Sequence, residues 1–102
     1  MPRRGEVWLV DLGMAQKTRP AVILNVPYGD TDRVVVTIVS HTTALRESPF
    51  EIVVPVPFLR EGAFAVQSVT TIPTKHALRR LGTLTAGQLA PIEEGVRQWL
   101  GL

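Results

Sequence analysis

Two apolar segments near the start of the chain constrain its fold more than any other feature. They span residues 4–13 and 19–24, are rich in valine, leucine and isoleucine, and are joined by only a few polar residues. Aliphatic and β-branched runs separated by so short a connection predict a connected pair of antiparallel strands. Arg19 stands at the first position of the second segment. Strand pairing would hold its backbone while its guanidinium, a rigid fork of donors suited to phosphate, projects into the loop region.

The β pattern continues through the first seventy residues. Valine, isoleucine and threonine dominate there, and turn residues recur at intervals typical of short antiparallel strands rather than βαβ units. Within residues 34–39, apolar side chains occupy both the odd and the even positions. This predicts a strand that is buried on both faces, by a closed barrel and a covering element. The expected strands lie near residues 5–12, 20–26, 33–40, 50–56 and 64–72.

The spacing of apolar residues changes near the end of the chain. Apolar residues recur there at helical spacing, which predicts an amphipathic helix across one opening of the barrel. Two starts remain open: Thr85 and Gln88 have the spacing of a capping box, whereas Pro91 favours a start one residue before it. Before the helix, residues 74–80 predict a basic segment that forms a short turn or a helical turn, and residues 81–84 predict a last edge strand. The apolar helix positions are Leu89, Ile92, Val96, Trp99 and Leu100.

Composition bounds the class of protein. With 102 residues the chain is expected to form one domain over residues 1–102. The 11 basic and 9 acidic residues give a small positive excess, so nucleic acid is allowed as a partner but not demanded. No cysteine is present, which excludes disulfides and thiolate chemistry and suits a reducing cytosol. No stretch approaches the roughly 20 apolar residues of a membrane span, so we expect a cytoplasmic protein that does not enter membranes.

The sequence lacks the common motifs of metal-dependent and nucleotide-dependent enzymes. It has no glycine-rich phosphate loop and no paired histidines, and its acidic residues are scattered or lie near the C-terminal helix. We therefore expect no metal and no cofactor. RNA can be cleaved without either, because its own 2′-hydroxyl attacks the adjacent phosphate. The protein then needs only to move protons and to stabilise negative charge with a cation and one or two polar groups.

Three residues carry groups suited to such a reaction. Arg19 is the leading cation, although an arginine in a hairpin loop is more often simply solvated. Lys17, two residues earlier, is a candidate phosphate contact with the same commoner alternative. His41 suits proton transfer or contact with a base, since the ordinary pKa of histidine is near 6.5. The residues alone are consistent with a cationic site and also with charged residues on a solvated loop.

Two stretches of sequence match patterns that occur together in one family. The first contains the Arg19-Pro20 pair within residues 4–24, and the second is Ser-Pro-Phe-Glu-Ile-Val-Val at residues 48–54. Together they resemble the MazF/PemK family of toxin ribonucleases, in which the arginine of the first pattern is catalytic and Pro-Phe-Glu-Val-Val forms a strand. The resemblance covers nearly the whole chain and is densest in residues 4–24 and 49–54.

The resemblance implies a mainly β fold, a small SH3-like barrel with a C-terminal α-helix. It also implies a homodimer whose grooves bind single-stranded RNA, and a cognate antitoxin whose flexible tail occupies the groove. The implied activity is that of a sequence-specific, metal-independent endoribonuclease that leaves 2′,3′-cyclic phosphate and 5′-hydroxyl ends, with Arg19 catalytic. A threonine or serine at the end of the third strand lines the family's cleavage site. That assigns a catalytic role to Ser40, with Thr42 or Thr43 as alternatives. We also expect Lys17, His41 and Thr42 to contact RNA, although members of the family do not consistently keep a histidine at the position of His41.

The fifth expected strand departs from the family pattern. Residues 65–72 resemble a family strand that reads acidic residue, glutamine, aliphatic residue, basic residue, then threonine or serine and isoleucine. Here Gln67 takes the acidic position, Ser68 the glutamine and Thr70 the basic residue. Gln67 and Ser68 are both expected to bind RNA, but which of them faces the site stays open, because neighbouring strand residues point to opposite faces. The connection at residues 14–18 is also shorter than in many members, which implies a different cleavage motif or weak activity.

Two other functions remain open. A barrel of the same architecture could act as a topoisomerase poison of the CcdB type, docking its terminal helix on gyrase without using Arg19. The altered fifth strand instead favours a catalytically inactive RNA-binding module. Whether Arg19 is needed for RNA cleavage separates both alternatives from a nuclease.

Overall fold

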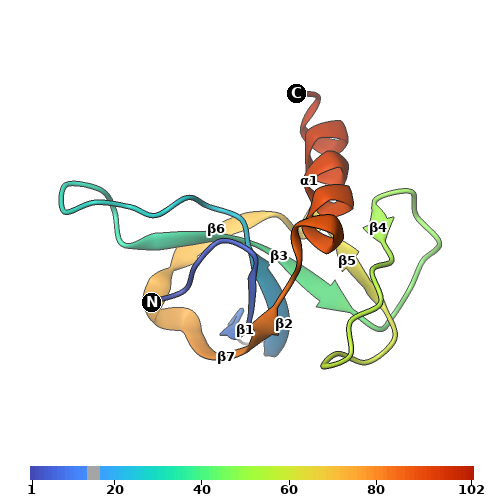
Figure 1. Cartoon of the computed structure of the whole chain (residues 1–102), viewed down its shortest axis with the longest axis horizontal. Helices are drawn as coiled ribbons and strands as arrows, with labels where there is room; N and C mark the ends of the chain where they lie inside the picture. The colour runs from blue at the N-terminus through green and yellow to red at the C-terminus, as the bar shows by residue number, and fades with distance from the viewer. Residues whose placement is uncertain (14–16) are drawn as a thin grey trace.

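A computed structural model describes residues 1–13 and 17–102 of the chain (Figure 1). Antiparallel strands dominate it, and one α-helix follows at the C-terminal end. The expected mainly β fold with a C-terminal helix is confirmed. The expectation of a short connection at residues 14–18 falls mostly on residues 14–16, which lie outside the described part.

Four strands form the centre of the sheet. β1 (Glu6–Asp11) lies between β2 (Thr18–Ile23) and β7 (Ala77–Thr83), and β3 (Val35–Thr42) pairs with the other edge of β2. All of these pairings are antiparallel. The predicted pairing of the first two segments is therefore confirmed, with Arg19 inside the β1–β2 ladder.

β3 is long enough to pair with two further strands on its other edge. Its first half pairs with β6 (Thr70–Pro73), and its last two residues pair with β5 (Ala63–Ala65). β5 also pairs with the short β4 (Glu51–Ile52). Among the described strands no pairing joins β7 to β4 or β6, so the sheet is open and the expected closed barrel is not formed.

Two apolar clusters bury opposite faces of this sheet. One face of β3 contributes Val36 and Ile38 to a cluster shared with β1 and β2. The other face contributes Val39 to a cluster that also holds residues of α1 (Ala86–Leu100). The alternation of side chains along a strand thus explains why residues 34–39 are apolar at both parities.

α1 begins at the capping box formed by Thr85 and Gln88. The Thr85 hydroxyl accepts a hydrogen bond from the Gln88 amide (3.1 Å), and the Gln88 side chain accepts one from the Thr85 amide (2.8 Å). The alternative start before Pro91 is wrong. Pro91 lies exposed inside the helix, and the N–H it lacks is offset by the cap and by complete burial of Ile92. No helix in the described part is long and apolar enough to cross a membrane.

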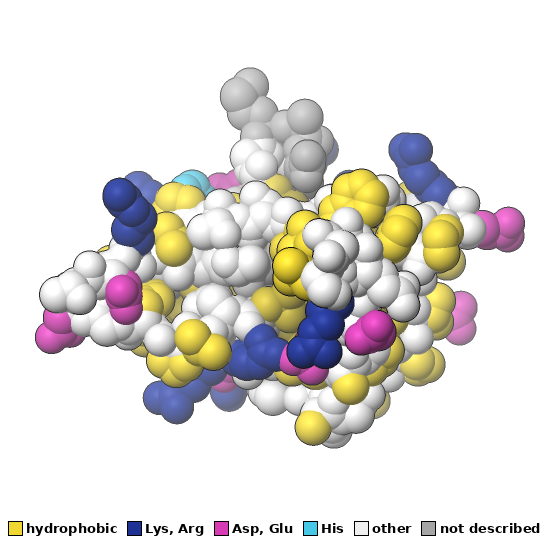
Figure 2. All heavy atoms as spheres, turned by 90° about the horizontal axis from the view of Figure 1, so that it is seen from above, with side chains coloured by type: hydrophobic (Ala, Val, Ile, Leu, Met, Phe, Trp, Pro, Cys, Tyr) yellow, Lys and Arg dark blue, Asp and Glu magenta, His cyan; other side chains and the backbone are white. Residues whose placement is uncertain are grey.

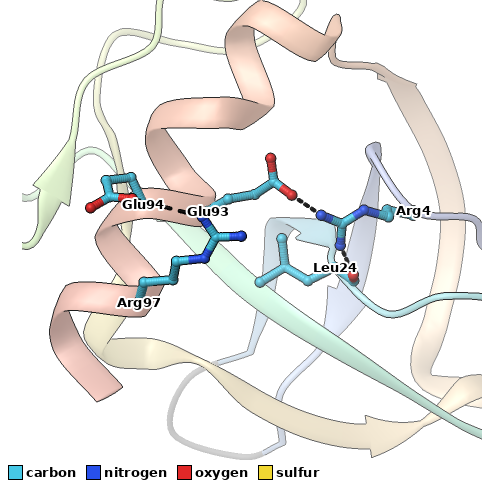
Figure 3. Close-up of polar contacts among 5 residues, drawn as sticks. All are labelled: Arg4, Leu24, Glu93, Glu94 and Arg97. Atoms are coloured by element: carbon cyan, nitrogen blue, oxygen red, sulfur yellow. Dashed lines mark hydrogen bonds and ion pairs between the residues drawn. The ribbon is translucent and has the colours of Figure 1, made fainter. Parts of the chain in front are cut away.

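Arg4 fastens α1 to the sheet. Its guanidinium donates to the carbonyl oxygen of Leu24, just past the end of β2, and forms an ion pair with Glu93 of the helix (Figure 3). One turn further along, Arg97 lies 3.9 Å from the carboxylate of Glu94. The contact through Arg4 fixes the side of the helix that faces the sheet.

Two expected strands are shorter than their sequence pattern indicates. Residues 64–72 are divided by η1 (Val66–Ser68), a 3₁₀ turn in which the Ser68 hydroxyl donates to the carbonyl three residues before it (2.6 Å). The strand expected at residues 50–56 ends at Ile52, and two prolines follow within five residues. Proline cannot donate to a ladder, so the pairing stops early.

The basic segment at residues 74–80 is a turn only in its first part. η2 (Thr74–His76) turns the chain, and the rest belongs to β7 on the edge of β1. There Arg80 forms an ion pair with Glu6 (3.2 Å). Burial alone would raise the pKa of Glu6, but hydrogen bonds from the Trp8 indole and from Arg80 help to lower it overall. The expected turn is therefore wrong for residues 77–80. Exposed charged residues are typical of turns, but here they stand on an edge strand that pairs with β1 through its backbone.

Candidate active site

The alternation of β2 and β3 places three of the predicted site residues on one face. Arg19 lies two positions from Ala21, which is buried, so both side chains point to the same side of β2. Ala21 is paired with Ser40 of β3. Because the strands are antiparallel, extending this register by two residues sets Arg19 opposite Thr42. The guanidinium and two hydroxyls therefore share the face of the sheet at the ends of neighbouring strands.

Arg19 and Lys17 are both exposed, on the side where the chain enters β2. Arg19 has no ion-pair partner among the residues that the structure describes. The backbone of Lys17 is fixed in the left-handed region (φ 55°), and its amide donates to the carbonyl of Gly13 (2.7 Å). Two cations thus project from an anchored strand entrance, an arrangement that attracts an anion.

Ser40 is committed to a hydrogen-bond network with η1. Its hydroxyl donates to the hydroxyl of Ser68 (2.8 Å), and its amide donates to the same oxygen (3.0 Å). The Ser68 hydroxyl in turn donates to the carbonyl of Ala65 (2.6 Å). Because both hydroxyl protons are used, Ser40 can accept a hydrogen bond from a ligand but cannot donate one without breaking the network. This geometry suits a residue that positions the end of β3.

Thr42 is better placed to donate to a phosphate oxygen. Its hydroxyl accepts a hydrogen bond from the amide of Ala44 (3.1 Å), which fixes the side chain and leaves the hydroxyl proton free. It is half-buried and stands in the row that contains Arg19. Thr43, the other alternative to Ser40, is exposed and lines a cavity that Arg19 also lines. The fixed side chain and the face shared with Arg19 favour Thr42 as the hydroxyl of the site.

Of the two residues of η1 that were expected to bind RNA, Ser68 faces the site and Gln67 does not contact it directly. The 3₁₀ turn directs Ser68 toward Ser40, whereas Gln67 is exposed to solvent. Ser68 also borders a depression of about 470 Å³ shared with Asp11, Thr70 and His76. The strand alternation assumed from the sequence does not apply, because the chain turns at this point.

His41 lies on the opposite face of β3 from Thr42 and is 5% exposed. Its ring meets Phe64, its neighbour on β5, edge-on at 5.0 Å. Burial lowers the pKa of His41 below its ordinary value of 6.5, so the imidazole is neutral at physiological pH. One edge of it nonetheless reaches a cavity that Arg19 also lines.

The burial of His41 makes stability depend on pH. As the pH falls below 6.5, unfolded His41 takes up a proton, whereas folded His41 does so only at its lowered pKa. The free energy of unfolding should therefore decrease as the pH falls from 7.5 to 5.5. Urea unfolding should show a smaller decrease for His41→Gln, and His76→Gln, at a more exposed histidine, serves as the control. An equal decrease in wild type and His41→Gln would contradict this account.

The cavity beside His41 brings in Arg60, a residue that the sequence did not single out. It has a volume of about 290 Å³ and lies between the ends of β2 and β3 and the loop before β5. Arg60 and Phe58 of that loop line it, together with Arg19. Nothing in the local sequence distinguishes Arg60 from a solvated loop charge, so only the fold reveals that it shares a cavity with Arg19.

Comparison with known proteins places this chain in one family. Residues 3–100 match the family model described as PemK-like, MazF-like toxin of type II toxin-antitoxin system. Endoribonuclease MazF9 of Mycobacterium tuberculosis is 30% identical over 116 aligned positions, which cover all of this chain and 98% of that protein. A mycobacterial endoribonuclease solved in complex with its cognate antitoxin has a TM-score of 0.84 at 24% identity, over 100% of this chain and 97% of that one. The Mycobacterium tuberculosis toxin MazF-mt6 has a TM-score of 0.78 at 25% identity, over 95% and 97%. The chain therefore belongs to the PemK-like, MazF-like toxin family of type II toxin-antitoxin systems.

Proposed function

We propose that this chain is the endoribonuclease toxin of its system and cleaves single-stranded RNA without a metal ion or cofactor. The observation that carries the proposal is the row formed by Arg19 and Thr42 at adjacent strand ends. The guanidinium is exposed and unpaired among the described residues, and the hydroxyl proton is free to donate. A cation and a donor on one face are the groups that stabilise a pentacoordinate phosphorus.

In the proposed reaction the 2′-oxygen of one nucleotide bonds to the adjacent phosphorus, and the bond from phosphorus to the 5′-oxygen breaks. The 2′-hydroxyl loses its proton and the departing 5′-oxygen gains one. The products are a 2′,3′-cyclic phosphate and a 5′-hydroxyl. Arg19 stabilises the charge on the non-bridging oxygens, Thr42 donates to one of them, and Ser40 holds the end of β3 through Ser68. Lys17 and η1, with Gln67, contact the flanking RNA.

Purified protein should cleave single-stranded RNA in the presence of EDTA, and the two hydroxyls should differ in their effect. Thr42→Val keeps the side-chain shape and removes the donor, so kcat should fall by about a hundredfold. Ser40→Ala should lower kcat by less, since the Ser68 oxygen keeps its bonds to the Ser40 amide and the Ala65 carbonyl. Initial rates on a defined transcript measure both. If Ser40→Ala abolished cleavage and Thr42→Val left it unchanged, Ser40 would be the donor.

The proposed partners follow from the surface and from the family. Figure 2 shows hydrophobic side chains gathered around the C-terminal end of α1. Trp99 (42% exposed), Leu100 (52%) and Leu102 (87%) are the large ones there. Large exposed apolar groups at one place favour a protein interface, and we assign it to a second copy of the chain. A cognate antitoxin is the second partner, and the cytoplasm, where RNA is translated, is the proposed place of action, in keeping with the absence of cysteine.

A further inference from the structure

The cavity that contains Arg19 and Arg60 has an unusual combination of walls. Its lining includes two arginines and no carboxylate. Neither arginine has an ion-pair partner within residues 1–13 and 17–102. Both arginines thus carry a positive charge at one small cavity with no carboxylate beside it, and an anion bound there would be attracted by both. The cationic side of the cavity is therefore suited to a phosphate.

The position of Arg60 is set by its neighbours on both sides. The ring of Phe58 lies directly on Gly82 of β7, where a Cβ would come within 2.5 Å of it. The amide of Leu59 donates to the carbonyl of Val56 (3.1 Å), and its side chain packs against the core. Gly62 lies against the backbone of β3. Arg60 is thus exposed on a fastened loop, which reduces the entropy lost when its guanidinium binds a ligand.

The remaining walls combine a flat apolar part with the hydroxyls of Thr18 and Thr43. Pro20 and Leu81 line the cavity beside Phe58. Phe58 is 39% exposed, so part of its ring is open to a ligand. The imidazole of His41 also lines the cavity, neutral and able to exchange hydrogen bonds with a base edge. A volume of about 290 Å³ is at the small end of ligand sites. A flat ring attached to a phosphate satisfies both the apolar and the cationic sides.

We infer that this cavity is a nucleotide subsite, in which a base of the RNA packs against Phe58 and Arg60 binds a phosphate next to the one that Arg19 stabilises. The inference rests on the proposed function and extends it, because it assigns a binding residue outside the row of Arg19 and Thr42. Arg60 acts in this subsite by holding the RNA, so its loss weakens binding and leaves the chemical step almost unchanged. Aromatic packing of a base contributes on any sequence, and His41 adds selectivity for base edges.

Binding of an uncleavable oligonucleotide tests the inference independently of catalysis. Single-stranded RNA of mixed sequence with 2′-O-methyl groups is titrated against wild type, Arg60→Gln and the control Arg33→Gln. Arg33 is an exposed arginine beside the opposite end of β3. Arg60→Gln should raise Kd about tenfold and reduce the salt slope by about one phosphate contact, whereas Arg33→Gln should change neither. Equal affinity and equal slope for Arg60→Gln and wild type would overturn the inference.

The placement of a base at Phe58 is tested by a double-mutant cycle, in which the base is removed from the oligonucleotide and the ring from Phe58. Removing bases from the oligonucleotide should weaken its binding to wild type more than its binding to Phe58→Leu, with thermal unfolding used to check that the variant is folded. Equal losses would overturn the placement of a base at Phe58. If Arg60→Gln weakens binding and no RNA is ever cleaved, the subsite stands and the nuclease function fails. If cleavage depends on Arg19 while Arg60→Gln binds normally, the function stands and the subsite fails.

Discussion

Replacing Arg19 by alanine is expected to lower the rate of RNA cleavage at least about a hundredfold, the scale of removing one donor that stabilises transition-state charge. The side chain is exposed at the entrance of β2, beyond the buried Ala21, so its removal leaves both apolar clusters intact. Initial rates on a defined transcript in EDTA measure the loss, and thermal unfolding shows that the variant is folded. Arg33→Ala is the matched control, since it removes an exposed arginine at the far end of β3.

The same variant separates the proposed nuclease from its alternatives. Arg19→Lys keeps the charge and loses the planar fork, so it should recover only part of the activity. Unchanged cleavage by Arg19→Ala would reject the catalytic role. If Arg19→Ala still arrested growth when expressed, a target such as a topoisomerase would replace RNA. If wild type bound RNA and never cleaved it, the chain would be an RNA-binding module.

Gly62→Ala is expected to produce the largest loss of stability among single methyl additions. A Cβ on Gly62 would lie 2.2 Å from the carbonyl oxygen of Thr42 and 2.8 Å from the His41 ring. Both atoms belong to the packed end of β3, so the loop and the strand must move apart. We expect the free energy of unfolding to fall by about 3 kcal/mol, at the upper end of ordinary overpacking. Urea unfolding measures it, and RNA cleavage should fall as Thr42 is displaced from Arg19.

Gly87→Ala provides the control for that substitution. Gly87 lies in the first turn of α1, where a Cβ would meet only the Thr85 hydroxyl at 3.9 Å. Alanine favours helix over glycine by up to about 1 kcal/mol, so this variant should be as stable as wild type or more stable. A Gly62→Ala variant with wild-type stability would show that the loop before β5 is not held against β3, and the fastened position of Arg60 would lose its support.

The parts of the fold that depend on local pattern could be predicted from the sequence. The pairing of β1 with β2 follows from two apolar runs with a short connection, and the start of α1 follows from the spacing of Thr85 and Gln88. The division of residues 64–72 by η1 could not be predicted, because it depends on the Ser68 hydroxyl finding the Ala65 carbonyl and on β3 passing alongside. The open sheet likewise depends on long-range pairing that no local pattern records.

The sequence predicts the cation of the candidate site and a hydroxyl near the end of β3. Arg19 stands at the entrance of an apolar strand, and the resemblance of the Arg19-Pro20 pair to a family pattern distinguishes it from a solvated loop arginine. The choice between Ser40 and Thr42 could not be made, since it depends on which hydroxyl proton is already used within the fold. Arg60 could not be found at all, because it approaches Arg19 from a loop about forty residues away.

The chemical nature of the ends left on cleaved RNA shows whether the 2′-hydroxyl of the RNA is the nucleophile. Purified protein is incubated in EDTA with a defined transcript, and with a matched oligonucleotide that carries a single 2′-deoxy sugar at the mapped cleavage position. We expect 2′,3′-cyclic phosphate and 5′-hydroxyl ends from the transcript, and no cleavage at the deoxy sugar, because the attacking oxygen is absent there. Products with 5′-phosphate ends, or cleavage that persists at the deoxy sugar, would contradict it.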